Sequence, residues 1–170
     1  MMSNMFKEGS LKFDFSPIHS VERFDIKHTN PYGMKSVDFV AETVDSTYFI
    51  EVKDFQNPKA SLRHKADYEM LISAGTEKKS LFAIEMGQKI KDSILRKYAM
   101  GEKICKKVIY LLVINLDKLG EFERGLLSSK ISGYIPSGLN DNRFAAFSSI
   151  AFYLINPEQL DAFGIKCVAD

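Results

Sequence analysis

Residues 35–55 alternate between apolar and polar positions in a way that predicts a β-hairpin. Apolar side chains occupy every second position from 37 to 41, which is the period of a strand with one buried face. Residues 48–52 are rich in the β-branched and aromatic side chains that strands favour. Asp45 and Ser46 supply a polar turn between the two segments. We therefore expect two adjacent strands joined by this turn.

Two helices and a buried strand are predicted downstream of the hairpin. Asn57 can cap a first helix, Pro58 suits its first position, and Gly75 stands where that helix should end. Residues 81–99 predict a second helix, because apolar residues recur every four positions. These residues are Phe82, Met86, Ile90, Ile94 and Tyr98. Residues 107–116 are nearly all apolar, as expected of a central strand that is covered on both faces.

The two ends of the chain show shorter patterns. Residues 11–15 alternate in hydrophobicity and predict a strand, whereas residues 18–27 fit either a short helical turn or a strand. Residues 147–155 predict a last strand. Asn156 and Pro157 then open a short terminal helix.

The region between the central strand and the last strand predicts a helix and a loop. Residues 121–130 are amphipathic through Phe122 and Leu126, and the glycines, proline and asparagines of residues 132–143 indicate a long loop. The full order of strands and helices predicts one α/β domain over residues 1–170. We expect a mixed sheet flanked by helices, in two or three layers.

Composition narrows the class of protein. The chain has 170 residues, of which 45% are hydrophobic and 26% charged, as in soluble globular domains. Its two cysteines, Cys105 and Cys167, argue against a disulfide framework and a thiolate zinc site, and fit a reducing cytosol. The longest apolar run, residues 108–114, is too short to span a bilayer. We therefore expect a cytoplasmic protein without a membrane partner.

The predicted hairpin carries the residues with the most specific chemistry. Glu51 and Lys53 point to one face of their strand, while Val52 points to the other. If Asp38 on the first strand faces the same way, two carboxylates and an ammonium converge. A divalent cation would relieve the repulsion between the carboxylates, and hard oxygen ligands suit Mg²⁺ or Mn²⁺.

This arrangement resembles the PD-(D/E)XK nuclease-like superfamily, whose signature is an acid on one strand and Glu-x-Lys on the next. Here Asp38 is followed, after 12 residues, by Glu51, Val52 and Lys53, and Val37 replaces the usual proline. The resemblance implies a restriction-endonuclease-like fold and an Mg²⁺-dependent deoxyribonuclease, that is, a metal-dependent phosphodiesterase. It implies that Asp38, Glu51 and the Val52 carbonyl hold Mg²⁺ or Mn²⁺. Lys53 would position or activate the attacking water, and a homodimer is expected because many such enzymes cut both DNA strands as dimers.

Three acid-x-Lys tripeptides compete for this role, at residues 25–27, 51–53 and 77–79. The first has Asp14 upstream, but a turn and another strand follow it. The third lies in a polar connection without an apolar run beside it. Only the second is followed by the helix and the buried strand that a parallel crossover requires.

Further residues are candidates for supporting roles at the site and for contacts with DNA. Relatives often carry another acid near the N-terminus, for which Glu22 is the candidate, and some carry a helix glutamine, for which Gln88 is the candidate. Residues 51–107 hold 13 Lys or Arg against 8 Asp or Glu, whereas the remainder holds 10 against 14. This basic excess makes DNA the expected partner, although a solvated helical face explains the same counts. The candidate DNA contacts are Lys59, Arg63, Lys65 and Lys89.

Two other hypotheses remain open. A catalytically inactive member of the same fold would bind nucleic acid or a protein partner, and its affinity for DNA would depend on salt. An unrelated α/β module would use Asp38, Glu51 and Lys53 as a cross-strand salt bridge or surface ion-pair network. A structure in which Asp38 and Glu51 face opposite sides of the sheet would favour the unrelated module.

Overall fold

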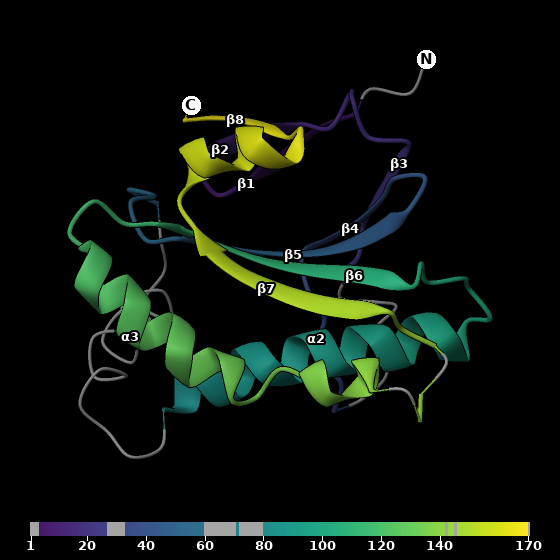
Figure 1. Cartoon of the computed structure of the whole chain (residues 1–170). Coiled ribbons are helices and arrows are strands. Elements are labelled where there is room, and N and C mark those ends of the chain that lie inside the picture. Colours follow the sequence, from purple (N-terminus) through teal and green to yellow (C-terminus); the bar gives the residue numbers. More distant parts are fainter. Residues whose placement is uncertain are drawn as a thin grey trace.

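Three layers make up the fold, with a large sheet between a small sheet and a layer of helices (Figure 1). The computed structural model describes residues 4–26, 33–59, 71, 80–141, 143–144 and 146–169. These residues form a single α/β domain with a mixed sheet, as the order of elements predicts.

The large sheet has five strands in the order β3-β4-β5-β6-β7. Their bounds are β3 Ser20–Arg23, β4 Phe39–Glu42, β5 Ser46–Asp54, β6 Lys107–Asn115 and β7 Ser149–Ile155. Neighbours from β3 to β5 run antiparallel, and neighbours from β5 to β7 run parallel. The predicted hairpin is confirmed as β4 and β5, and the ambiguous segment at residues 18–27 contains strand β3.

The register of the sheet brings one end of β4 next to the carboxyl end of β5. Phe39 pairs with Ile50 in the antiparallel ladder, so Asp38 immediately precedes the strand rather than lying inside it. On the other side of β5, Asp54 pairs with Asn115 of β6. This end of the large sheet therefore gathers the polar residues of β5 and the segment that leads into β4.

Strand β6 is buried on both faces, as its uniform hydrophobicity predicts. The even-numbered buried side chains of β6 pack into the core on the helical side, and the odd-numbered ones pack into the core on the side of the small sheet. The first set is Val108, Tyr110, Leu112 and Ile114, and the second is Ile109, Leu111 and Val113.

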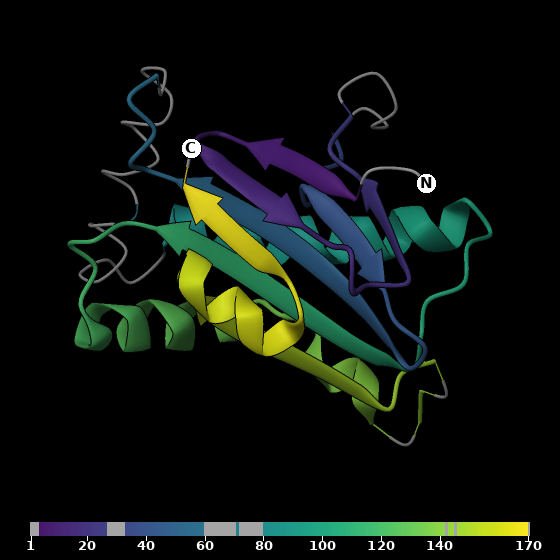
Figure 2. The same ribbon diagram turned by 90° about the horizontal axis from the view of Figure 1, so that it is seen from above.

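The small sheet contains two strands that the sequence pattern did not predict. It consists of β1 (Met5–Glu8), the predicted β2 (Leu11–Asp14) and β8 (Lys166–Ala169), all antiparallel in the order β1-β2-β8. Figure 2 shows it lying across the large sheet. Phe13 and Phe15 pack against the Phe39 ring at 5.6 and 5.7 Å between centroids.

Helix α2 (Leu81–Ala99) covers the opposite face of the large sheet (Figure 1). It begins where predicted, because Ser80 accepts a hydrogen bond from the Ala83 N–H at 3.1 Å and caps the helix. The predicted stripe is buried at its first four members, but Tyr98 is largely exposed. Of the helix predicted over residues 57–75, the segments 60–70 and 72–79 lie outside the described residues.

Helix α3 (Glu121–Ser132) buries a different face from the one predicted. Leu127 and Ile131 enter the core, whereas Phe122 and Leu126 are exposed. Both stripes repeat every four residues and are apolar, so packing against α2 and β7 decides between them.

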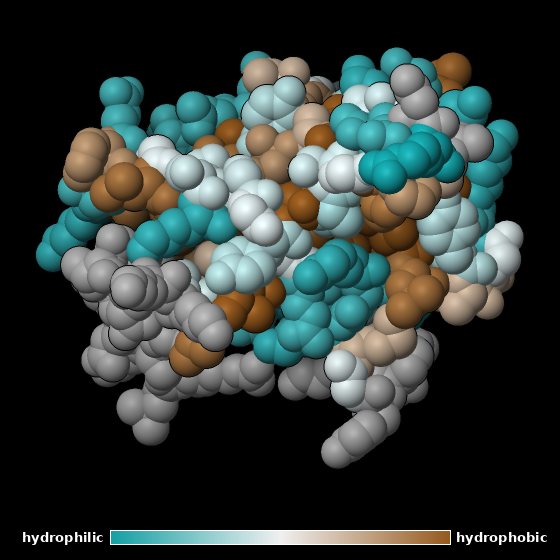
Figure 3. Space-filling model, turned by 60° about the horizontal axis from the view of Figure 1, so that its bottom comes forward, coloured by the Kyte–Doolittle hydropathy of each residue, from teal (hydrophilic) through white to brown (hydrophobic). Residues whose placement is uncertain are grey.

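The surface in Figure 3 mixes hydrophilic residues with separate hydrophobic ones.

The remaining connections are largely as predicted. The segment 132–143 contains a short 3₁₀ helix, η1 (Ser137–Asn140), and the terminal helix is the 3₁₀ helix η2 (Pro157–Phe163). Gly87 of α2 lets the backbone of Tyr134 approach, since a Cβ at this glycine would lie 2.8 Å from the Tyr134 carbonyl oxygen. None of the described helices combines the length and apolar character needed to cross a bilayer.

Candidate functional site

Asp38 stands where the chain enters β4, and both β5 and α2 fix its place. Its Oδ2 accepts a hydrogen bond of 2.6 Å from the backbone N–H of Val52. The N–H of Val37 donates to Ser93 Oγ on α2 at 3.0 Å. Strand β5 therefore holds the carboxylate itself, and α2 holds the backbone of the preceding residue.

Glu51 meets two ammonium groups inside the protein. Its Oε1 lies 2.6 Å from Lys89 Nζ and 3.3 Å from Lys53 Nζ. The Glu51 side chain is only 1% exposed, and its Oε2 is buried without a hydrogen-bond partner among the described residues. A buried carboxylate oxygen without a partner is costly, so this atom is a position where a ligand would stabilise the protein.

The electrostatics couple Asp38 to this ion-pair network. The pKa of Asp38 rises to about 7, because burial and, after it, the Glu51 charge raise the pKa more than Lys89 and the Val52 N–H lower it. Burial alone would lower the pKa of Lys89, but the charges of Glu51 and Asp38 raise it above its ordinary value. The charges of Asp38, Glu51 and Lys89 therefore act on one another.

The negative charges of Glu51 and Asp38 also act on the buried Tyr110. Its hydroxyl donates to the Met86 carbonyl oxygen at 3.2 Å and is fully buried. Burial raises the pKa of Tyr110 well above its ordinary value, and the negative charges of Glu51 and Asp38 add to the shift.

Two further acids lie beside Asp38, and the sequence analysis missed both of them as site residues. Carboxylate oxygens of Glu8, Asp25 and Asp38 all lie within 4.8 Å of one another. Arg23 forms ion pairs with Glu8 and, at 3.4 Å, with Asp25. No local pattern marks Glu8, because it comes from strand β1 of the small sheet. Asp25 belongs to the rejected tripeptide at residues 25–27, whose lysine lies outside the described residues.

The donor set fits a hard divalent cation. Carboxylate oxygens are the ligands that Mg²⁺ and Mn²⁺ prefer, and Glu51 Oε2 needs a partner. Together the group of acids around Asp38 and the ion-pair network of Glu51 contain four carboxylates and the three cationic side chains Arg23, Lys53 and Lys89, which leaves one excess negative charge when Asp38 is ionised. Val52 enters the site through its N–H, and its carbonyl as a metal ligand stays a prediction.

Glu22 is placed elsewhere and is not the further acid next to Asp38. Its Oε1 lies 3.0 Å from Lys97 Nζ, which also contacts Glu42 at 3.2 Å and Glu102 at 2.8 Å. The physical reason is that β3 is extended rather than helical at this point, so Glu22 faces the last turns of α2.

The remaining candidates are only partly described. Lys89, predicted to contact DNA, instead holds Glu51 with its ammonium. Lys59 is exposed beyond β5, and Gln88 is half-buried on α2. Arg63 and Lys65 lie outside the described residues. DNA contact by any of these side chains stays a prediction.

The site therefore combines a buried acid that titrates near neutral pH, a second buried acid and two lysines at one end of a mixed sheet. Comparisons of the chain with family models, with curated proteins and with solved structures give no match.

Proposed function

We propose that this protein is a metal-dependent phosphodiesterase that hydrolyses DNA on a restriction-endonuclease-like fold. The observation that carries the proposal is the buried Glu51, which meets two lysines with one oxygen and leaves the other without a described partner. Purely structural ion pairs are usually saturated, whereas sites that act on ligands keep such groups available.

The carboxylates supply the metal ligands in this proposal. Asp38 and Glu51 hold Mg²⁺ or Mn²⁺, and Glu8 and Asp25 support the site from its other side. When bound, the ion polarises a phosphoryl oxygen and lowers the pKa of water. Because the site has one excess negative charge, a divalent cation makes it net positive and attractive to a phosphodiester.

Lys89 and Lys53 have different roles in this proposal. Lys89 is tied to Glu51 at 2.6 Å, so it orients that carboxylate and balances its charge in the interior. Lys53 makes the longer contact of 3.3 Å and extends further along β5. Its ammonium orients the attacking water and stabilises the charge that develops on the phosphoryl group.

Metal binding tests the proposal before any substrate is known. We expect wild-type protein to bind Mn²⁺, measured by electron paramagnetic resonance, and to nick supercoiled plasmid DNA with Mg²⁺. Asp38→Asn should lose both properties, whereas Asp161→Asn, an exposed acid of η2, should keep them. If wild type and Asp38→Asn bind Mn²⁺ equally, the site is assigned wrongly.

A binding module without catalysis is the second candidate. It is favoured by the two lysines on Glu51 Oε1, because an ammonium competes with a metal for the same oxygen. This candidate predicts salt-dependent DNA binding without Mn²⁺ binding and without nicking. The same two assays therefore separate the candidates.

A further inference from the structure

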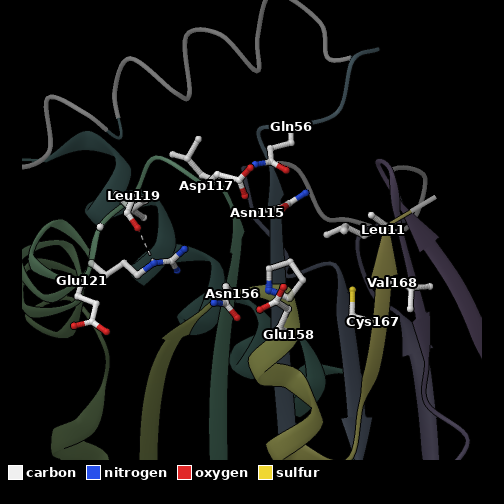
Figure 4. Close-up of a pocket in the computed structure, with 15 residues that line it drawn as sticks. Leu11, Gln56, Asn115, Asp117, Leu119, Glu121, Asn156, Glu158, Cys167 and Val168 are labelled. Carbon is white, nitrogen blue, oxygen red and sulfur yellow. Dashed lines mark hydrogen bonds between the residues drawn. The ribbon is translucent and has the colours of Figure 1, made fainter.

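A separate cavity of about 690 Å³ lies over the ends of β6 and β7. Figure 4 shows its lining, which comes from the end of β6, the start of α3, the start of η2 and strand β8. Ligands of α/β proteins commonly bind at the carboxyl ends of parallel strands. The volume lies within the range of small-molecule sites in proteins.

Arg124 on the first turns of α3 provides a donor to this cavity. Its Nε donates to the Leu119 carbonyl oxygen at 3.1 Å, which fixes the orientation of the guanidinium. Another nitrogen of the guanidinium, Nη1, is buried and has no hydrogen-bond partner among the described residues. An unpaired buried donor is unfavourable, so an acceptor from a ligand would stabilise the guanidinium in place.

The acids of the lining exclude a phosphate as the natural partner of Arg124. Asp117, Glu121 and Glu158 also line the cavity, so its lining has three acidic residues and one cationic residue. A phosphate would be repelled by this excess negative charge. A neutral molecule that offers acceptors to the guanidinium and N–H donors to a carboxylate satisfies both kinds of group.

The side-chain amides of the lining offer one hydrogen-bond acceptor and one donor to a ligand. The Asn115 side-chain nitrogen donates to Asp54 at 2.7 Å, which leaves its carbonyl oxygen as an acceptor for a ligand. The Asn156 side-chain oxygen accepts from the Gln159 N–H at 3.0 Å, which leaves its nitrogen as a donor. Figure 4 shows Asn115 and Asn156 in the lining, with Glu158 beside Asn156.

We propose that this cavity binds a neutral nucleobase of the guanine type. Guanine presents the O6 and N7 acceptors that a guanidinium recognises, and its N1–H and N2–H groups donate to carboxylates such as Glu158. Leu11, Leu119 and Pro157 provide apolar surface for the faces of the base. This inference does not depend on phosphodiester hydrolysis at the metal site.

Calorimetric titration of the whole chain with guanosine tests the proposal. We expect Arg124→Met to weaken guanosine binding at least about tenfold, because it removes the guanidinium that donates to O6 and N7 of the base. Arg143→Met is the matched control, since that side chain is 80% exposed and pairs with Asp141, and it should bind like wild type. Adenosine should bind more weakly than guanosine, and guanosine monophosphate should also bind more weakly because the carboxylates repel its phosphate.

A second variant keeps the test decisive if Arg124→Met unfolds. Glu158 is exposed, so Glu158→Gln should fold, weaken guanosine binding and reduce the disadvantage of guanosine monophosphate. Absence of guanosine binding to wild type at millimolar concentration would overturn the proposal. Equal binding of adenosine, or unchanged guanosine binding in either folded variant, would overturn it as well.

Discussion

Helix α2 carries two buried lysine clusters that differ in how completely their charges are satisfied. Lys89 meets Glu51, and Lys97 meets Glu22, Glu42 and Glu102. The two lysines are eight residues apart, about 12 Å along a helix. Both lie between the helix and the large sheet, and both have a pKa raised above the ordinary value by neighbouring carboxylates, against the effect of burial.

Solvent access separates the two clusters. The side chains of Glu22, Glu42 and Glu102 are 42%, 32% and 33% exposed, so water hydrates the oxygens that Lys97 does not reach. Glu51 is 1% exposed, and its second oxygen has neither water access nor a described partner. Only the Lys89 cluster also contains an acid, Asp38, whose pKa rises to about 7.

The difference shows which cluster is structural and which is a candidate site. A lysine surrounded by hydrated acids is satisfied and needs no ligand. A buried carboxylate such as Glu51, whose second oxygen has no described partner, is destabilised, and a bound cation removes that cost. Four experiments test this distinction, from the largest expected effect to the smallest.

Removing one carboxylate from each cluster should separate them most clearly. Glu51→Gln should lower Mg²⁺-dependent plasmid nicking at least about 100-fold, because it removes a proposed ligand of the metal. Glu22→Gln should leave the rate close to wild type. Equal losses in the two variants would show that nicking does not depend on the Glu51 site.

The pH dependence of stability should identify the buried acid. The pKa of Asp38 rises from 3.8 to about 7 on folding, so the folded protein keeps a proton that the unfolded chain releases. Asp38 therefore contributes stability that is full below about pH 4 and is lost as pH rises through 7. Relative to Asp38→Asn, wild type should lose roughly 1.4 kcal/mol of unfolding free energy per pH unit between pH 5 and 7.

Urea denaturation in the absence of metal measures this difference, and comparison with the variant cancels the other titrating groups. The difference should level off above pH 7, and saturating Mn²⁺ should restore wild-type stability at pH 8. A pH-independent difference between the two proteins would show that Asp38 is ionised throughout.

Truncating Lys97 should affect stability rather than metal binding. Lys97→Met should lower the unfolding free energy by about 1–3 kcal/mol, since three carboxylates lose their cation while water still screens them. Lys103→Met, an exposed neighbour, is the control and should change little. If the folded Lys97→Met protein failed to bind Mn²⁺, the clusters would not be independent.

Glu8, from the small sheet, should contribute to the affinity of the proposed metal site. Glu8→Gln should weaken Mn²⁺ binding about tenfold, because it removes one charge from the group around Asp38. Glu42→Gln, which alters the Lys97 cluster, should leave the affinity unchanged. Direct titration with Mn²⁺ measures both, and equal affinities in the two variants would remove Glu8 from the site.

Local patterns predicted the elements that hold the site more accurately than the faces they present. Strand β5 of the hairpin, α2 and β6 were predicted because their hydrophobic patterns extend over nine or more residues. The buried face of α3 was predicted wrongly because Phe122 and Leu126 are as apolar as Leu127 and Ile131. Strands β1 and β8 were missed because their residues, MFKE and KCVA, do not alternate in hydrophobicity as the LKFD of the equally short β2 does.

The sequence by itself placed Asp38, Glu51 and Lys53 on one hairpin, because alternation and turn chemistry act over short distances along the chain, although Asp38 lies just before its strand. Only the tertiary structure decided which other charges surround them. Lys89 comes from a helix, and Glu8 comes from a second sheet, so no local pattern relates them to the hairpin. Burial, which shifts the pKa of Asp38 and leaves Glu51 short of a partner, exists only once these layers have packed together.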